Sequence, residues 1–315
     1  MEIYTSLSNY KSTNKTFVTI GTFDGVHIGH KKVIKKLIKS AKKNKATSVL
    51  LTFFPHPRMV LQKDLDIKLI NTIEERTKLL EKLGLDVLII HPFNEEFSRY
   101  SALDFVRKIL VNTLNISQLV IGYDHHFGKN REGNFEQLQD YGFTYNFKVK
   151  KISQQEIKDI TVSSTKIRKA IENSEIAKAN SYLGYNFMLN GTVIHGNNLG
   201  EKIGFPTANL NISEDYKLVP KTGAYIVKSK LGNKFYFGMM NIGFRPTVSG
   251  KNQTIEIHFF DFKGNLYDKK IKIEVISFLR DEHKFDSIEN LKIQLEKDKL
   301  NSINFLKNEY SKTNF

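Results

Sequence analysis

The chain has 315 residues, which is enough for about two domains of ordinary size, and 40% of them are hydrophobic. It contains no cysteine, so disulfide frameworks, thiolate zinc sites and cysteine nucleophiles are excluded. Lysine and arginine total 48 against 33 acidic residues, and the net charge of +15 indicates a polyanionic partner: nucleic acid, an acidic membrane surface or a phosphate-rich small molecule.

The N-terminal segment lacks the apolar core of a secretory signal. Apolar runs such as residues 49–54 are far too short to cross a bilayer. These patterns predict a soluble, cytoplasmic protein that does not act in a membrane, and none of them specifies an oligomeric state.

The first half alternates short apolar runs with helical patterns. Apolar residues recur at helical spacing between Val33 and Ala41, a capping box begins at Thr72, and another helix begins at Ser101. Four segments typical of buried strands alternate with these helices, at residues 17–23, 48–54, 86–90 and 118–122. This order predicts a parallel α/β sheet, in which ligands bind at the carboxyl ends of the strands.

The second half has a different order of predicted elements. A helical stretch over about residues 164–183, with Ser174 as its expected cap, is followed by strands with few helices between them, and Ser287 caps a final helix. The predicted strands are residues 186–194, 223–230, 233–243, 254–262 and 269–279. We predict an α/β domain at residues 1–184 and a small antiparallel β-barrel with a terminal helix at residues 185–315.

The segment GTFDGVHIGH (21–30) leaves the first predicted strand and enters a helix. His27 and His30 lie three residues apart, and Gly29 allows close backbone approach. A helix N-terminus suits phosphate, and two imidazoles beside it can donate hydrogen bonds to an α-phosphate as charge builds there. The alternative is a pair of capping histidines on an ordinary loop.

A second candidate phosphate site is TVSSTKIRKAI (161–171). Ser164 and Thr165 stand at the start of the predicted helix, with Lys166 and Arg168 in its first turn. The hydroxyls can hold phosphates, and Arg168 can neutralise a departing pyrophosphate. Taken alone, the segment fits a well-capped basic helix better. Together with the histidine motif, it favours a phosphate-binding site.

The barrel half opens with a glycine-rich segment in which Gly196, Gly200 and Gly204 let the backbone approach ATP phosphates. The segment does not match the P-loop pattern, so a Walker-type ATPase is not supported. Thr207 and Asn209 then point the same way on an extended segment and offer oxygens to Mg²⁺. A polar turn ahead of a strand is the alternative.

Downstream, TIEIHFFDF alternates between two faces. Glu256 and His258 share one face, and Ile255, Ile257 and Phe259 share the other. A carboxylate on a barrel strand can take the proton from an attacking hydroxyl, which makes Glu256 a candidate catalytic base. A solvated strand face is the commoner role of a lone glutamate.

The N-terminal motifs together resemble the FAD synthetase module of prokaryotic bifunctional riboflavin kinase/FMN adenylyltransferases, a member of the HxGH nucleotidyltransferase group. The resemblance rests on GTFDGVHIGH, TFFPHPRMVL (52–61), VIGYDHHFGKNREGN (120–134) and VSSTKIR. It implies that Asp124 lies near the flavin phosphate and that ATP is surrounded by Gly21, Phe23, Asp24, His27, His30, Ser164, Thr165 and Arg168. The chain departs from the family at His125 and His126, where an aromatic and a basic residue are usual. His56, between two prolines, fits a rigid turn and a functional role equally well.

The C-terminal motifs resemble the riboflavin kinase module, on GEKIGFPTANL, NIGFRPTV (241–248), TIEIHFFDF and ISFLRDEHKFDSIENLKIQL (276–295). The resemblance implies that Thr207 and Asn209 serve the Mg²⁺–ATP site, that Glu256 is the base, and that Arg280 meets the flavin. Asp268 stands where the family usually has glycine.

Together the resemblances imply a bifunctional enzyme that uses ATP and Mg²⁺ to convert riboflavin to FMN and FMN to FAD. A monofunctional riboflavin kinase with a degenerate N-terminal half is the first alternative. A basic RNA-associated protein is the second, but the lysine runs carry neither interleaved aromatic residues nor an RNP-type motif. The expected partners are therefore riboflavin, FMN and ATP rather than nucleic acid.

Overall fold

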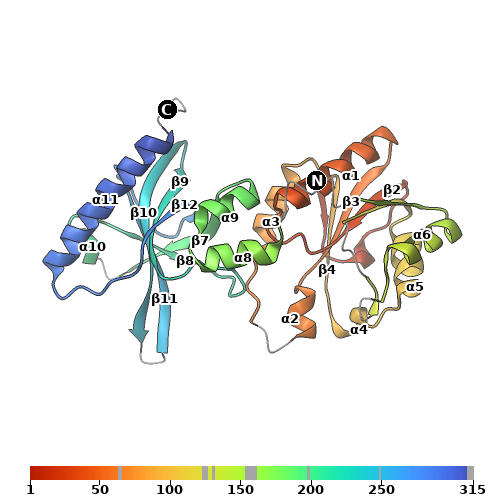
Figure 1. Cartoon of the computed structure of the whole chain (residues 1–315), viewed down its shortest axis with the longest axis horizontal. Helices are drawn as coiled ribbons and strands as arrows, with labels where there is room; N and C mark the ends of the chain where they lie inside the picture. The colour runs from red at the N-terminus through yellow and green to blue at the C-terminus, as the bar shows by residue number, and fades with distance from the viewer. Residues whose placement is uncertain are drawn as a thin grey trace. The chain divides into compact units, whose positions relative to one another are not determined.

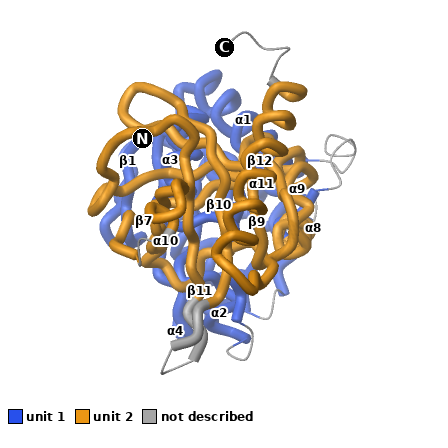
Figure 2. The backbone as a smooth tube through the Cα atoms, turned by 90° about the vertical axis from the view of Figure 1, so that its left-hand side faces the viewer, with its two compact units in different colours: residues 1–164 blue, residues 165–315 orange. Residues whose placement is uncertain are grey.

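The structure is a computed structural model that describes residues 1–62, 66–122, 127–129, 132–152, 162–196, 199–247 and 250–310. The chain divides into two compact units, residues 1–164 and residues 165–315 (Figure 1; Figure 2). A functional boundary between residues 184 and 185 stays a prediction. The second unit contains most of α8 (Ser164–Glu172) and all of α9 (Ile176–Leu183).

The first unit is built on a parallel six-stranded sheet in the order β1-β4-β3-β2-β5-β6. Its strands are β1 (Glu2–Tyr4), β2 (Thr16–Ile20), β3 (Thr47–Phe53), β4 (Val87–His91), β5 (Ile116–Ile121) and β6 (Lys148–Lys151). The strand order reverses between β2 and β5, and such a switch point is where open α/β sheets bind ligands. The predicted histidine motif begins directly after β2.

The helical segments of this unit are η1 (Leu7–Asn9), α1 (Ile28–Lys43), α2 (Pro57–Leu61), α3 (Ile73–Glu81), α4 (Glu95–Ser98), α5 (Ala102–Asp104), the π-helix η2 (Phe105–Thr113) and α6 (Phe135–Thr144). The capping box at Thr72 and the cap at Ser101 are both confirmed. The buried residues of α1 are Gly29, Val33, Ile34, Leu37 and Ala41, so its predicted apolar face is confirmed as well.

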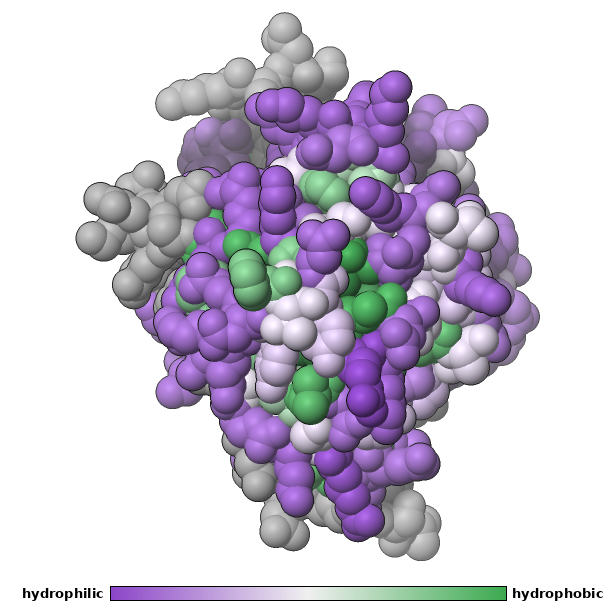
Figure 3. Space-filling view, turned by 90° about the vertical axis from the view of Figure 1, so that its right-hand side faces the viewer, coloured by the Kyte–Doolittle hydropathy of each residue, from purple (hydrophilic) through white to green (hydrophobic). Residues whose placement is uncertain are grey.

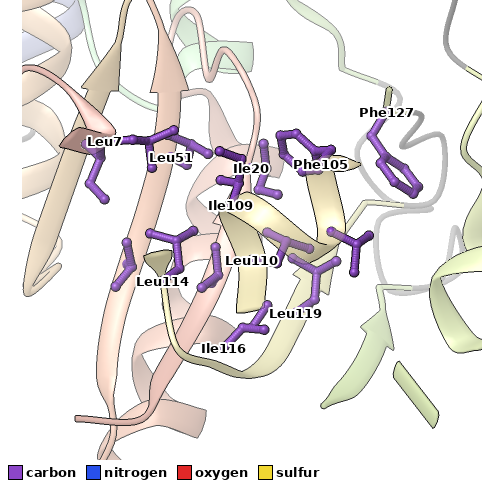
Figure 4. Packing of buried hydrophobic residues seen from close by; sticks show 14 of the residues in the cluster. Leu7, Ile20, Leu51, Phe105, Ile109, Leu110, Leu114, Ile116, Leu119 and Phe127 are labelled. Atoms are coloured by element: carbon purple, nitrogen blue, oxygen red, sulfur yellow. The ribbon is translucent and has the colours of Figure 1, made fainter. Parts of the chain in front are cut away.

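Both faces of the sheet are buried. Alternate strand residues Leu50 and Val120 pack with α1, and their neighbours Leu51 and Leu119 pack with η2 on the other face (Figure 4). Because strands covered on both faces have no solvent-facing side, they appear in the sequence as continuous apolar runs rather than as alternating patterns.

The second unit is a closed barrel in the order β10-β11-β8-β7-β12-β9. Its strands are β7 (Phe187–Ile194), β8 (Ala208–Asn211), β9 (Gly223–Leu231), β10 (Lys234–Thr247), β11 (Gly250–Phe259) and β12 (Lys270–Arg280), and neighbouring strands pair in antiparallel orientation. The short α10 (Leu199–Lys202) lies between β7 and β8. In β12, buried Ile271, Ile273 and Val275 alternate with the half-buried Lys272 and Glu274, as a filled barrel interior requires.

The final helix α11 (Ile288–Tyr310) packs on β10 outside the barrel. Its Leu306 packs in a hydrophobic cluster with Phe205, Ile226, Met239, Phe260 and Ile276. The Ser287 hydroxyl accepts a hydrogen bond from the Asn290 amide, which confirms the predicted cap. The fold class predicted from the sequence, a parallel α/β domain followed by an antiparallel barrel with a terminal helix, is confirmed.

The cap expected at Ser174 is confirmed at the end of α8: Ser174 has a left-handed φ of 58°, and the amides of Ser174 and Glu175 donate to the carbonyls of Ile171 and Ala170. Its hydroxyl is hydrogen-bonded to the Tyr225 hydroxyl, 2.8 Å away. Other expected details are wrong. The first strand ends at Ile20 rather than residue 23, because Phe23 already has a positive φ of 47°. The strands β1, β6 and β8 are not predicted, since they have only three or four residues each and leave little pattern. The helix α6 is not predicted either, although Asn134 and Gln137 form a capping box at its start.

On the face shown in Figure 3, hydrophilic side chains dominate and hydrophobic ones gather only in small groups. Within the described ranges, no helix carries an apolar stretch of the length that a bilayer crossing needs.

Candidate active sites

The loop between β2 and α1 brings the two motif histidines into contact. His27 caps α1, and its Nδ1 accepts a hydrogen bond from the His30 amide at 3.3 Å. The two imidazole rings stack with centroids 3.6 Å apart, and the Phe23 ring meets His30 edge-on at 5.0 Å. The capping alternative therefore holds for His27, whereas the ring of His30 stacks on that of His27.

Burial keeps both imidazoles neutral near pH 7. Desolvation lowers the pKa of His27 to about 4, against a smaller opposing effect of Asp24. Desolvation also lowers the pKa of His30 well below its usual value, and the neighbouring His27 and Arg76 act in the same direction. Because the Nδ1 of neutral His27 accepts a hydrogen bond, its proton lies on Nε2, which is left as a donor.

This depressed pKa makes the stability of the first unit depend on pH. The unfolded chain binds a proton at His27 below about pH 6.5, whereas the folded chain resists it until about pH 4. The free energy of unfolding should therefore fall by roughly 3 kcal/mol as the pH drops from 6.5 to 4, because one pKa unit corresponds to about 1.4 kcal/mol. Calorimetric melting of the parent and of His27→Asn, which keeps a capping side chain, measures the difference. An equally steep decline in both proteins would contradict this assignment.

Asp24, a residue of the motif loop, is fully buried. Its two carboxylate oxygens accept hydrogen bonds from the amides of Ile70 and Asn71, both at 3.1 Å. The Nη2 atom of Arg76, also buried, lies 3.7 Å from one of these oxygens. This network ties α3 and the segment before it to the loop that carries the histidines.

Arg76 belongs to none of the sequence motifs described above. It lies at helical spacing between Ile73 and Leu80 on the buried side of α3, and a charged residue on an otherwise apolar helix face is the signal that would have found it.

Replacing Arg76 by methionine should leave the Asp24 charge buried without its cation. We expect the free energy of unfolding of the first unit to fall by about 3–5 kcal/mol, and the double variant Arg76→Met/Asp24→Asn to lose less than the sum of the two single substitutions. Denaturant unfolding of the four proteins of the cycle measures the coupling. The control is Lys78→Met on the exposed side of the same helix, where the lysine side chain is 65% exposed. Additive effects of the two substitutions would show that Asp24 and Arg76 do not interact.

The other residues implied for ATP lie around the same loop or on α8. The Ser164 hydroxyl donates to the Asp24 carbonyl at 2.8 Å, which places the start of α8 beside the loop. A Cβ at Gly21 would lie 3.1 Å from the Phe23 ring, so the absence of a side chain there lets that ring pack closely. Thr165 is exposed and Arg168 half-buried within the second unit.

The strand β5 ends at Ile121, shortly before the predicted flavin contact Asp124. Asp124, His125 and His126 themselves lie outside the described residues. His56 caps α2, where its Nδ1 accepts a hydrogen bond from the Arg58 amide at 3.1 Å. Of the two roles that the sequence allows for His56, the structural one is therefore present.

In the barrel, the glycine-rich segment folds back onto the predicted metal ligands. A Cβ at Gly196 would collide with the Asn209 amide, and one at Gly200 would collide with the Phe205 carbonyl and lie 3.4 Å from the Thr207 methyl. Only glycine permits this approach at both positions. Gly204 has a φ of +86° but nothing near its Cβ position, so it serves the turn rather than a close contact.

Glu256 lies in the middle of a row of polar residues. In the strand register it stands opposite Asn209 on β8 and opposite Asn241 on β10. Cross-strand neighbours project from the same face, so the carboxylate and both amides lie on one side of the wall, the side away from the buried Ile255 and Ile257. The predicted alternation of this strand is confirmed.

Arg280 ends β12 and is engaged with the terminal helix. Its guanidinium donates to both carboxylate oxygens of Asp298, at 2.7–3.0 Å, and to the Asp281 carbonyl at 2.9 Å. Gln294 also donates to Asp298 at 2.7 Å. The structure thus gives Arg280 a role in anchoring α11, and its predicted flavin contact stays a prediction.

Among the described residues, no group of three or more histidine, aspartate or glutamate side chains could hold a metal ion. Hydroxyl and amide oxygens together with nucleotide phosphates are a donor set that Mg²⁺ accepts. Thr207 and Asn209 provide these two oxygens and fit that requirement.

Comparison with known proteins links each unit to one activity. The FAD synthetase family model matches residues 9–166, and the riboflavin kinase family model matches residues 183–306. Bifunctional riboflavin kinase/FMN adenylyltransferases of Buchnera aphidicola (subspecies Schizaphis graminum) and Bacillus subtilis are 40% and 38% identical to this chain over 303 residues. The alignments cover 95% of this chain and 96% of the first relative, and 93% of both chains for the second.

The Escherichia coli K12 protein of the same description is 34% identical over 289 residues, covering 91% of this chain and 92% of its own. Among solved structures, one described as a macrolide-efflux protein from Streptococcus pneumoniae superposes with a TM-score of 0.87 at 28% identity. It covers 96% of this chain and 98% of its own length.

Proposed function

Because the chain belongs to the bifunctional riboflavin kinase/FMN adenylyltransferase family, we propose a role in its two reactions for each of the residues described above. The enzyme phosphorylates riboflavin to FMN and adenylylates FMN to FAD, and ATP is a substrate of both reactions. The riboflavin kinase domain is C-terminal and the FAD synthetase domain N-terminal. We place the functional boundary between residues 184 and 185.

In the kinase reaction, Glu256 removes the proton of the riboflavin 5′-hydroxyl as that oxygen attacks the γ-phosphate of ATP. The observation that carries this assignment is the row Asn241–Glu256–Asn209 across three neighbouring strands. The row puts a carboxylate beside one of the proposed metal ligands, and a base must lie within hydrogen-bond reach of the hydroxyl it activates.

Thr207 and Asn209 would hold the magnesium ion of Mg²⁺–ATP in the barrel. When bound, the ion neutralises negative charge on the phosphates. The chain's contribution is the cradle formed by Gly196 and Gly200, whose missing side chains bring the preceding loop against these two residues. Backbone amides of that loop, with Gly204 at its turn, bind the phosphates.

In the adenylylation reaction, the FMN phosphate attacks the α-phosphate of ATP, and pyrophosphate leaves. The nucleophile is already anionic, so positioning and charge stabilisation carry the catalysis rather than a strong base. His27 Nε2 donates to the α-phosphate. His30 Nδ1 is buried and has no hydrogen-bond partner among the described residues, which fits a contact completed by the nucleotide.

The remaining assignments follow the family resemblance. Gly21, Phe23, Asp24, Ser164, Thr165 and Arg168 form the ATP site of the first reaction. For Asp24 the buried network argues for an indirect role, through the shape of the loop. Asp124 and Arg280 contact flavin in the adenylylation and kinase sites respectively.

The test of this assignment is the product of each reaction. We expect the protein with riboflavin, ATP and Mg²⁺ to form FMN and then FAD, and with supplied FMN to form FAD and pyrophosphate in equal amounts. Chromatography of the flavins and a pyrophosphate assay measure both. Formation of FMN without FAD from supplied FMN would favour the monofunctional kinase and would contradict the roles given to His27 and His30. Omitting Mg²⁺ should stop FMN formation.

A further inference from the structure

A histidine of the barrel that the reactions above do not use connects the two strands of the kinase site. His258 follows Glu256 by two residues on β11, so both side chains project from the same face. The side chain of His258 is largely buried, and its Nδ1 lies 2.9 Å from the carbonyl oxygen of Pro206. Because a carbonyl oxygen can only accept, Nδ1 carries the proton of this hydrogen bond.

The carbonyl that His258 holds lies directly before the proposed metal ligands. Pro206 precedes Thr207, and β8 begins only at Ala208. The described pairing of β8 with β11 consists of Asn209 opposite Glu256 and Ala208 opposite Ile257. Pro206 and Thr207 are therefore outside the paired part of the strand, and a proline has no N–H with which to extend the ladder. The side chain of His258 supplies a hydrogen bond at this point instead.

Packing around the same contact fixes the segment from a second side. The Phe205 ring meets the His258 imidazole edge-on with centroids 5.1 Å apart, and Phe205 is itself buried in the cluster beneath α11. The Phe205 carbonyl, in turn, faces Gly200 so closely that no side chain fits there. His258 thus touches the segment that carries Thr207 through both a ring contact and a hydrogen bond.

We propose that His258 is a positioning residue of the riboflavin kinase reaction, which holds the Pro206 carbonyl so that Thr207 and Asn209 face the Mg²⁺–ATP beside Glu256. This inference rests on the roles proposed for those three residues. It assigns His258 no contact with substrate. Its effect is to couple the strand of the base to the segment of the metal ligands, so its loss should change metal and nucleotide requirements before it changes the fold.

The kinetic test compares substitutions that keep or move the donor. The amide nitrogen of asparagine is three bonds from Cα, as Nδ1 of histidine is, whereas that of glutamine is four bonds away, as Nε2 is. We expect His258→Leu and His258→Gln to lower kcat/KM for Mg²⁺–ATP in riboflavin phosphorylation by roughly 10- to 100-fold, since small displacements of positioning groups have effects of this size. His258→Asn should retain activity within a few-fold of the parent, and excess Mg²⁺ should restore part of the loss in the other two.

Two controls separate positioning from loss of packing. Phe260→Leu removes apolar contacts beside His258, since Phe260 directly follows β11, meets the His258 ring edge-on with centroids 6.0 Å apart and is buried in the cluster beneath α11. It leaves in place the imidazole that makes the hydrogen bond. FMN adenylylation by the same preparations reports on a unit with its own core. We expect both controls to change by less than a few-fold. If His258→Leu does not fold, the comparison of asparagine with glutamine at this position decides the question.

The hydrogen bond itself has a readout that does not depend on activity. In ¹⁵N-histidine spectra of the full chain, the His258 signals, assigned by their loss in His258→Asn, should show a proton on Nδ1 and none on Nε2. A proton on Nε2 alone would overturn the proposal. So would equal kinetic losses in the asparagine and glutamine variants, parallel losses of both activities, or unchanged kinetics in His258→Leu. If instead the proposed role of Glu256 as base is wrong, Glu256→Gln will retain riboflavin kinase activity. That result does not depend on the outcome for the His258 variants.

Discussion

Replacing Glu256 by glutamine should stop riboflavin phosphorylation while FMN adenylylation continues. The substitution keeps the size and most of the hydrogen-bonding capacity of the side chain in the row between Asn209 and Asn241, but it removes the proton acceptor. Loss of a general base lowers rates by about 10²–10⁴-fold, and we expect kcat for FMN formation to fall by that factor. FAD formation from supplied FMN, measured in the same preparation, should change by less than two-fold (roughly 0.4 kcal/mol or less).

The matched control is Glu274→Gln on β12. Glu274 is a strand carboxylate of the same barrel, and it pairs with Lys272 at 2.6 Å. Its substitution tests whether any change of charge on the barrel wall affects the kinase. If Glu274→Gln and Glu256→Gln reduced FMN formation equally, the role of Glu256 as base would be untenable.

Replacing His30 by alanine should have the reverse effect. The ring stacks on His27 at the N-terminus of α1, where its buried Nδ1 has no hydrogen-bond partner within the described ranges. Removing one donor that stabilises developing charge costs about 10²–10³-fold in kcat, and we expect FAD formation to fall by this amount. Riboflavin phosphorylation should continue, because the barrel has a separate core from the unit whose helix α1 carries His30.

His91→Asn is the control for this prediction. His91 is another half-buried imidazole of the same unit, at the end of β4, and its Nδ1 accepts from the Leu7 amide at 3.3 Å. Melting temperatures of both variants show whether the fold survives. A comparable loss of FAD formation in His91→Asn would mean that disturbance of the unit, rather than the motif imidazole, limits the reaction.

Much of the architecture could be predicted because it depends on short-range patterns. The continuous apolar runs of β2, β3, β4 and β5 reflect burial on both faces of the sheet, and the alternation of β11 reflects a barrel wall. The caps at Thr72, Ser101 and Ser287 are local hydrogen bonds between residues three apart. Strands with few apolar residues, such as β6 (KVKK), leave no such pattern and were missed.

For the sites, too, only the local arrangement of neighbouring residues could be predicted from the sequence. The order of residues in 21–30 and 256–258 already indicates which side chains share a helix start or a strand face. The sequence could not indicate that the Asp24 carboxylate turns inward to the amides of Ile70 and Asn71, far along the chain. Nor could it indicate that Arg280, expected beside the flavin, pairs with Asp298 of the last helix.

The sequence by itself therefore determined the fold class, the order of the two units and the local shape of the motifs, because these depend on periodicity and on neighbours within a few residues. Only the tertiary structure decided which partners the charged and polar side chains meet: Arg76 with Asp24, Arg280 with Asp298, and His258 with the Pro206 carbonyl. The physical reason is that a buried polar group must find a hydrogen-bond partner wherever the fold provides one, and that partner can lie at any distance along the chain.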